Sequence, residues 1–232
     1  MANSYTYTSE LWLQGRPTFH VIRTLLLNIR TETICKPLTN TSYYGINGGF
    51  YHGASYDTTP ERSSSICYNK ADVGKTISVN GKTFNKNYNY NISSSGSKIK
   101  KKTMVIYATS TGLKAATYRY VDNINSILSE FPNAEQIIGG TDYNLDSWGE
   151  KAYYLPTQRT VLAWDGVTAY LIVTDIPQTI PGLKANIEQL GLNPSNSIIL
   201  DGSGSTAMKC KEYTKKGGER HIFNMIRLTQ TT

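Results

Sequence analysis

Residues 196–208 read NSIILDGSGSTAM and place an acid directly after a short apolar run. Such a run is typical of a buried strand, so Asp201 is predicted at the edge of a sheet, where that strand ends. Gly202 and Gly204 permit positive φ and expose backbone N–H groups to a ligand. The stretch therefore predicts an anion pocket beside a carboxylate, although it also fits an ordinary strand-to-turn connection.

Four further motifs occur along the chain: GINGGFYHG at 45–53, IIGG at 137–140, QRTVLAWDG at 158–166 and ERHIFN at 219–224. In this order, together with the DGSGS turn, they resemble the phosphodiester glycosidase family, whose signature runs NGGFF, IGG, RT, LDGGGS and R-x-V-x-N. The resemblance covers about residues 43–228, and five ordered motifs are far more specific than any one. Ser203 departs from the pattern, because the family usually has a glycine there.

The resemblance implies a hydrolase that cleaves the glycosidic C1–O–P bond of a sugar 1-phosphodiester or a nucleotide-sugar-like substrate. A departing phosphomonoester is a stable anion with a second pKa of about 6, so cations and N–H donors help it more than a strong acid does. The oxocarbenium-like transition state at the sugar needs a nearby carboxylate. Asp201 is the candidate, as a base toward water or as a nucleophile.

Two other residues are predicted to be catalytic. Arg159 can engage two phosphoryl oxygens with its planar fork, although a structural ion pair at a strand start is the alternative. Thr160 would point to the opposite face of that strand, so only one of the two reaches the pocket. Asp175 is the candidate second acid, because the family tends to place an acid near this point.

The candidates for substrate binding lie in the same motifs. Their alternative roles are structural: NGG also suits a tight hairpin turn, and Asn224 can tie the last strand to its sheet. The candidates are Asn47, Gly48, Gly49, Gly140, Thr160, Gly202, Ser203, Gly204, Ser205, Thr206, Arg220 and Asn224. His52, which follows NGGFY, is a further candidate for proton transfer near neutral pH.

No His, Cys and carboxylate set has the spacing of a catalytic metal site, so no cofactor is expected. Ca²⁺ or Mg²⁺ bridging Asp201 and a substrate phosphate stays open. Cys35, Cys67 and Cys210 match no disulfide framework and are interpreted as reduced thiols. The start of the sequence shows no secretory signal and no run is long enough to span a bilayer, which favours a cytoplasmic, possibly phage-encoded protein without membrane contact.

The net charge of +7 comes almost entirely from residues 82–102, which hold six lysines and no acid. This segment is predicted to be a peripheral polar loop that attracts anions over a long range. Its interleaved aromatic residues also suit binding of a phosphorylated wall polymer by a phage module, whereas nucleic acid is a less favoured partner. A third possibility is a protein that sequesters a phosphodiester or nucleotide-like ligand without turnover. The oligomeric state stays open.

The excess of strands over helices predicts the α+β class, and the resemblance implies a mixed, mostly antiparallel, curved β-sheet with a few packed helices, in one domain over residues 1–232. Strands are expected at 21–29, 76–79, 103–108, 161–164, 169–173, 197–200 and 222–228, and long loops at 51–67 and 82–102. One helix is expected after Asp122 and before Pro132, and a second from Pro181 to a stop at Gly191.

Overall fold

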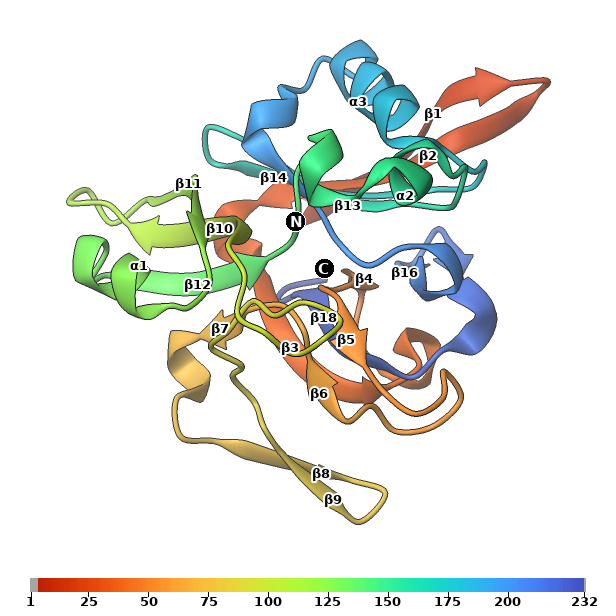
Figure 1. Cartoon of the computed structure of the whole chain (residues 1–232). Coiled ribbons are helices and arrows are strands. Elements are labelled where there is room, and N and C mark those ends of the chain that lie inside the picture. The colour runs from red at the N-terminus through yellow and green to blue at the C-terminus, as the bar shows by residue number, and fades with distance from the viewer. Residues whose placement is uncertain (1–3, 232) are drawn as a thin grey trace.

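The computed structural model describes residues 4–231, and their strands form three larger antiparallel sheets and two small hairpins (Figure 1). The first sheet has the strand order β1-β2-β14-β13-β15. These strands are β1 (Tyr5–Leu13), β2 (Arg16–Leu25), β13 (Thr160–Asp165), β14 (Thr168–Thr174) and β15 (Ser197–Ile199). The second sheet, β11-β10-β12-β7, consists of β7 (Cys67–Asn69), β10 (Lys101–Ala108), β11 (Lys114–Val121) and β12 (Ala134–Gly139).

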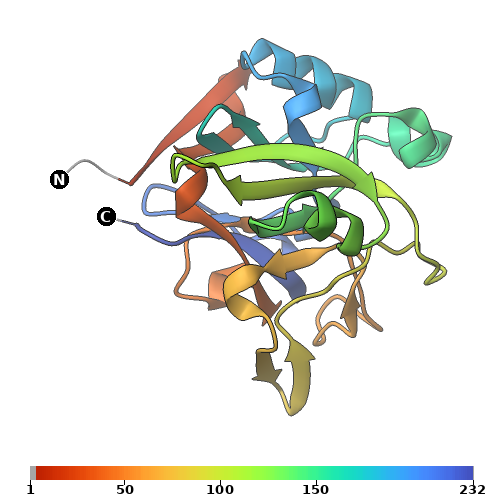
Figure 2. The same ribbon diagram turned by 90° about the vertical axis from the view of Figure 1, so that its left-hand side faces the viewer.

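The third sheet has the order β17-β16-β4-β18-β3. It consists of β3 (Ile29–Lys36), β4 (Gly45–Asn47), β16 (Met208–Lys209), β17 (Thr214–Lys215) and β18 (Ile222–Leu228). The hairpins are β5 (Tyr51–His52) with β6 (Arg62–Ser63) and β8 (Thr76–Val79) with β9 (Lys82–Asn85). The β8–β9 hairpin projects from the rest of the molecule in both views (Figures 1 and 2). The predicted α+β class with mostly antiparallel, curved sheets is confirmed.

Helices cover the outer faces of two of the sheets. The helix α3 (Ile180–Gln189) packs Ile180, Leu183 and Ile187 on the first sheet, and α1 (Asn125–Glu130) packs Ile127 on the second. The short α2 (Glu150–Tyr154) lies beside α3 (Figure 1). No helix among residues 4–231 is both long and apolar enough to cross a membrane.

The three sheets enclose one central apolar cluster. Each sheet directs one of its faces toward this cluster, because side chains alternate between the two faces of a strand. Ile22 and Leu162 come from the first sheet, Met104 and Ile138 from the second, and Ile46 and Ile226 from the third, all of them buried. Burying each such side chain contributes about 1.5–3 kcal/mol, so the sheets depend on one another for stability. Their edges meet around this cluster.

The prediction of one continuous strand at 21–29 is wrong in one respect. A 3₁₀ turn at Leu26–Asn28 interrupts it and carries the chain from the first sheet to the third. The reason is the buried side chain of Asn28. Its amide donates to the carbonyl oxygens of Ser4 and Gln230 at 3.2 and 3.0 Å, and its Oδ1 accepts from the Gln230 N–H at 2.6 Å. A buried amide with these partners holds a corner that apolar periodicity does not reveal.

The expected loops at 51–67 and 82–102 are also only partly loops. The first contains the β5–β6 hairpin, and the second contains β9, an isolated bridge between Ile92 and Lys98, and the first two residues of β10. Within β10, Lys102 is 4% exposed. The prediction that the whole lysine-rich segment is peripheral is therefore wrong at Lys101 and Lys102, whereas Lys98 and Lys100 are exposed as expected.

Both expected helices are present. The N-terminal cap of α3 is Thr179, whose side chain accepts from the Gly182 N–H, and Gly191 has a φ of 76° after its end. In front of α1 the Asn123 side chain, and not Asp122, accepts from the Asn125 N–H at 2.9 Å. The three cysteines are free thiols, as predicted, and all three are buried.

Candidate functional site

The carboxyl ends of β4 and β15 meet at the side chain of Asn47, which has no exposed surface. Its Nδ2 donates to the carbonyl oxygen of Asp201 at 2.7 Å. Its Oδ1 accepts from the Thr160 hydroxyl at 2.7 Å and from the Ala207 N–H at 3.0 Å. One amide thus joins β4, β13 and both ends of the DGSGS turn. The structure places Asn47 and Thr160 under the turn that carries Asp201, where they hold its backbone.

The predicted glycines bring segments of the chain together at this point. A Cβ at Gly48 would lie 1.6 Å from Asn224 Oδ1, and one at Gly49 would lie 2.6 Å from Ser65 Cβ. Asn224 Oδ1 accepts from the Gly49 N–H at 3.0 Å, so it ties β18 to the NGG segment, which is its alternative, structural role. Gly140 and Gly202 likewise face backbone carbonyl oxygens, from which a Cβ would lie only 2.8 and 2.7 Å away.

The carboxylate of Asp201 lies half-buried beside this junction. Burial raises the pKa of Asp201 to about 6, and the Ser205 hydroxyl and the Gly202 N–H oppose that rise. The Gly202 N–H donates to Asp201 Oδ1 at 3.0 Å. The positive charges of Arg220 and Lys101 oppose it further. Asp201 is therefore an acid that titrates near neutral pH in a positively charged setting.

Lys101 is a site residue that the sequence reasoning missed. Its ammonium group donates to the Ser64 carbonyl oxygen at 3.3 Å and lies 5.3 Å from the Phe50 ring centroid. Burial lowers the pKa of Lys101 to about 8, and the charge of Asp201 partly offsets this. The sequence signal that could have identified Lys101 is the apolar run at 103–108, shortly after it. This run extends the strand back to Lys101, and the sheet then fixes the position of the lysine.

Arg220, a candidate for substrate binding, supplies the second cation near Asp201. Its guanidinium lies 3.7 Å from the Tyr56 ring centroid, and it packs so closely on Gly204 that a Cβ there would lie 2.4 Å from Arg220 Nε. Gly204 is therefore required for this arginine to reach the DGSGS turn. Ser203, exposed in the same turn, has a φ of 58°, so the serine occupies the left-handed conformation that glycine adopts more easily.

Several buried polar atoms around the turn have no hydrogen-bond partner among the described residues. They are Thr206 Oγ1, His221 Nδ1 and Asn224 Nδ2. Each unpaired buried group costs about 1–3 kcal/mol, so these three atoms are candidate contacts for a ligand.

Arg159 is not brought to Asp201. Its side chain is 4% exposed and donates to the carbonyl oxygens of Gln178 at 3.0 Å and Leu155 at 2.8 Å. Its guanidinium lies 5.0 Å from the Trp148 ring centroid. Arg159 forms no ion pair with the described residues, because it points to the face opposite Thr160 and binds backbone carbonyls there.

Asp175 belongs to a separate polar cluster. It pairs with His20 at 2.9 Å and with Lys215 at 2.8 Å, and it accepts from the Tyr213 hydroxyl at 3.0 Å. The bonds and charges of Lys215 and His20 lower the pKa of Asp175 below its usual value despite its burial. Its carboxylate is thus fully engaged by the protein. His52 is exposed and faces Glu61 at 3.7 Å.

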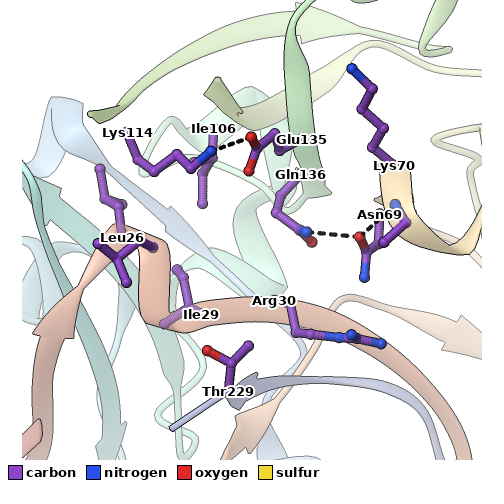
Figure 3. Close-up of a pocket in the computed structure, with 12 residues that line it drawn as sticks. Leu26, Ile29, Arg30, Asn69, Lys70, Ile106, Lys114, Glu135, Gln136 and Thr229 are labelled. Atoms are coloured by element: carbon purple, nitrogen blue, oxygen red, sulfur yellow. Dashed lines mark hydrogen bonds and ion pairs between the residues drawn. The ribbon is translucent and has the colours of Figure 1, made fainter. Parts of the chain in front are cut away.

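Two further observations limit the possible site chemistry. No group of three or more His, Cys, Asp or Glu side chains in the described part of the chain can hold a metal ion. A separate cavity of about 470 Å³ lies between the sheets, and Figure 3 shows two pairs in its wall, Lys114 with Glu135 and Gln136 with Asn69.

Comparison with solved structures shows what this fold resembles. The catalytic domain of zebrafish N-acetylglucosamine-1-phosphodiester alpha-N-acetylglucosaminidase, auto-inhibited by its pro-peptide, is similar at a TM-score of 0.57 and 14% identity, over 98% of this chain and 82% of that chain. A hypothetical protein from Synechocystis is similar at a TM-score of 0.52 and 13% identity, over 96% of this chain and 61% of that one. No protein-family model and no curated protein matches the sequence. The resemblance inferred from the motifs is thus confirmed at the level of the fold.

Asn47→Ala is expected to lower the free energy of unfolding by about 3 kcal/mol, or the Tm by roughly 6–12 °C, because it leaves buried partners in three segments unpaired. Thermal unfolding followed by circular dichroism checks this. Asn40→Ala, at an exposed asparagine, is the control and is expected to change the Tm little. Equal Tm values for both variants would contradict the role assigned to Asn47.

Asp201→Asn is expected to stabilise the protein at pH 8 and not at pH 4. A carboxyl whose pKa is raised in the folded state favours folding when protonated, and this advantage is lost as pH rises from about 4 through about 6. Asparagine does not ionise, so the variant gains roughly 1 kcal/mol, or about 2–4 °C in Tm, at pH 8. Asp165→Asn, at an exposed aspartate, is the control, and a gain that is equal at both pH values would refute the interpretation.

Proposed function

We propose that this protein is a hydrolase that cleaves the glycosidic C1–O–P bond of a sugar 1-phosphodiester. The observation that carries the proposal is the position of the Asp201 carboxylate beside the cations of Lys101 and Arg220, on a glycine-rich turn whose Gly202 N–H donates to it. The fold similarity to a phosphodiester glycosidase catalytic domain supports hydrolase chemistry in general terms.

The charges suit this reaction. The two cations can bind the phosphate of the substrate and stabilise it as it leaves, so that little protonation of the leaving group is needed. With a pKa of about 6, Asp201 is mostly ionised at neutral pH and can stabilise positive charge at the anomeric carbon. It then acts either on a water molecule as a base or on the carbon as a nucleophile.

Sequestration of a phosphodiester without turnover is the alternative that uses the same groups. The engagement of Asp175 by His20, Lys215 and Tyr213 favours it, because the predicted second acid is then not free to act. A sequestering protein returns its ligand intact on denaturation, whereas a hydrolase releases the free sugar. Binding of wall polymer by a phage module needs only the exposed lysines, such as Lys98 and Lys100.

Asp201→Asn is expected to lower kcat by about 10²-fold or more while a sugar 1-phosphodiester still binds, since the variant loses an interaction made in the transition state. In the unaltered protein, kcat/KM is expected to rise with pH through about 6, as Asp201 ionises. Hydrolysis in ¹⁸O-labelled water is expected to label the sugar. Label on the phosphate would mean P–O cleavage and would exclude a glycosidase.

Arg220→Gln is expected to raise KM for the phosphodiester by about tenfold with little loss of stability, because a charge-assisted phosphate contact is lost. Arg159→Lys is the matched comparison. It is expected to lower the Tm by several degrees and to leave KM unchanged for a phosphodiester without a base, such as methyl N-acetylglucosamine 1-phosphate, since lysine cannot reproduce the fork that binds two carbonyl groups. If Arg159→Lys raised KM and Arg220→Gln lowered only the Tm, then Arg159 and not Arg220 would be the phosphate contact.

A further inference from the structure

A cleft of about 600 Å³ has Lys101 and Thr141 on its wall. Lys101 also acts on the Asp201 carboxylate, and Thr141 forms a β-bridge with Ile199, two residues before Asp201. Asp201 itself does not line the cleft, but these two residues place the cleft next to the segment that carries the carboxylate.

One wall of the cleft is a fixed aromatic surface formed by Phe50 and Trp148. Their ring centroids are 6.1 Å apart with the planes at 71°. The Trp148 indole N–H donates to the Asp142 carbonyl oxygen at 2.8 Å, and Arg159 lies 5.0 Å from the indole ring centroid. Because Arg159 is itself held by backbone carbonyls, the indole is oriented before any ligand binds.

The polar groups of the cleft complement this wall. The exposed Lys100 and the half-buried Lys101 give it positive charge next to the aromatic rings. Asp146, exposed on a neighbouring turn, can accept hydrogen bonds from sugar hydroxyls or ring N–H groups. Hydroxyl groups of Ser94 and Ser147 add further donors. An aromatic surface beside paired cations is the chemistry that binds a planar base linked to phosphate.

We propose that this cleft is the leaving-group subsite and that it takes a nucleoside diphosphate, with the base on Trp148 and Phe50 and the phosphates on Lys100 and Lys101. The proposal rests on the proposed function and names its substrate class, a sugar nucleotide. Hydrolysis then forms a C1–O bond from water and breaks the C1–O bond to phosphate. The nucleoside diphosphate leaves with the bridging oxygen, and the water proton passes through Asp201 to solvent.

A binding measurement tests the subsite without turnover. In calorimetry with the full chain, UDP is expected to bind at least about tenfold more tightly than pyrophosphate, because stacking adds to the phosphate contacts. Trp148→Leu is expected to remove that difference and leave pyrophosphate binding unchanged. Tyr154→Leu, at an aromatic residue on α2 that is 56% exposed, is the control and is expected to retain it.

Two further variants keep the test informative if Trp148→Leu fails to fold. Phe50→Leu is expected to weaken UDP binding several-fold without affecting pyrophosphate, and Lys100→Gln is expected to weaken both ligands, most strongly at low salt. UDP that binds no more tightly than pyrophosphate, or a preference that both aromatic replacements leave unchanged, would overturn the proposal.

Measurements of kcat/KM distinguish a failure of this inference from a failure of the proposed function. UDP-N-acetylglucosamine is expected to have a kcat/KM about tenfold or more above that of methyl N-acetylglucosamine 1-phosphate, and Trp148→Leu is expected to bring the two values together. Equal values in the unaltered protein would refute the nucleotide subsite and leave the hydrolase standing. Binding of UDP that depends on Trp148, without hydrolysis of either compound, would refute the hydrolase and leave the subsite standing.

Discussion

The buried amide of Asn47 is the interaction on which the rest of this site depends. Its two polar atoms bind the Asp201 carbonyl, the Thr160 hydroxyl and the Ala207 N–H, so the position of the DGSGS turn is set by a group with no exposed surface. The glycines around it are needed because the segments touch: Gly48 and Gly49 lie against Asn224 and Ser65, where no Cβ fits. Together, these motif residues fix the position of the Asp201 carboxylate.

That placement has an electrostatic consequence. Burial disfavours the charged form of Asp201, and the cations of Arg220 and Lys101 only partly compensate, so its pKa is raised to about 6. Buried polar atoms nearby, such as Thr206 Oγ1 and Asn224 Nδ2, have no hydrogen-bond partner among the described residues. Both conditions lower the stability of the folded protein.

Arg159 shapes the cleft indirectly, through the Trp148 ring. The strand alternation that turns Thr160 toward Asn47 sends Arg159 to the opposite face, where it binds the carbonyls of Leu155 and Gln178 and lies behind Trp148. Its guanidinium fixes an aromatic ring that lines the cleft beside Asp201.

The sequence by itself determined the local features of this protein. The fold class, the strands Thr76–Val79 and Ile222–Leu228, the helix ending before Gly191 and the turn that follows the strand before Asp201 are explained by apolar periodicity and turn chemistry, which act between near neighbours. Only the tertiary structure decided which side chains meet. It brought Lys101 to Asp201, removed Arg159 and Asp175 to other surroundings and broke the predicted strand at Asn28, because these outcomes depend on buried hydrogen bonds between distant residues that no local pattern encodes.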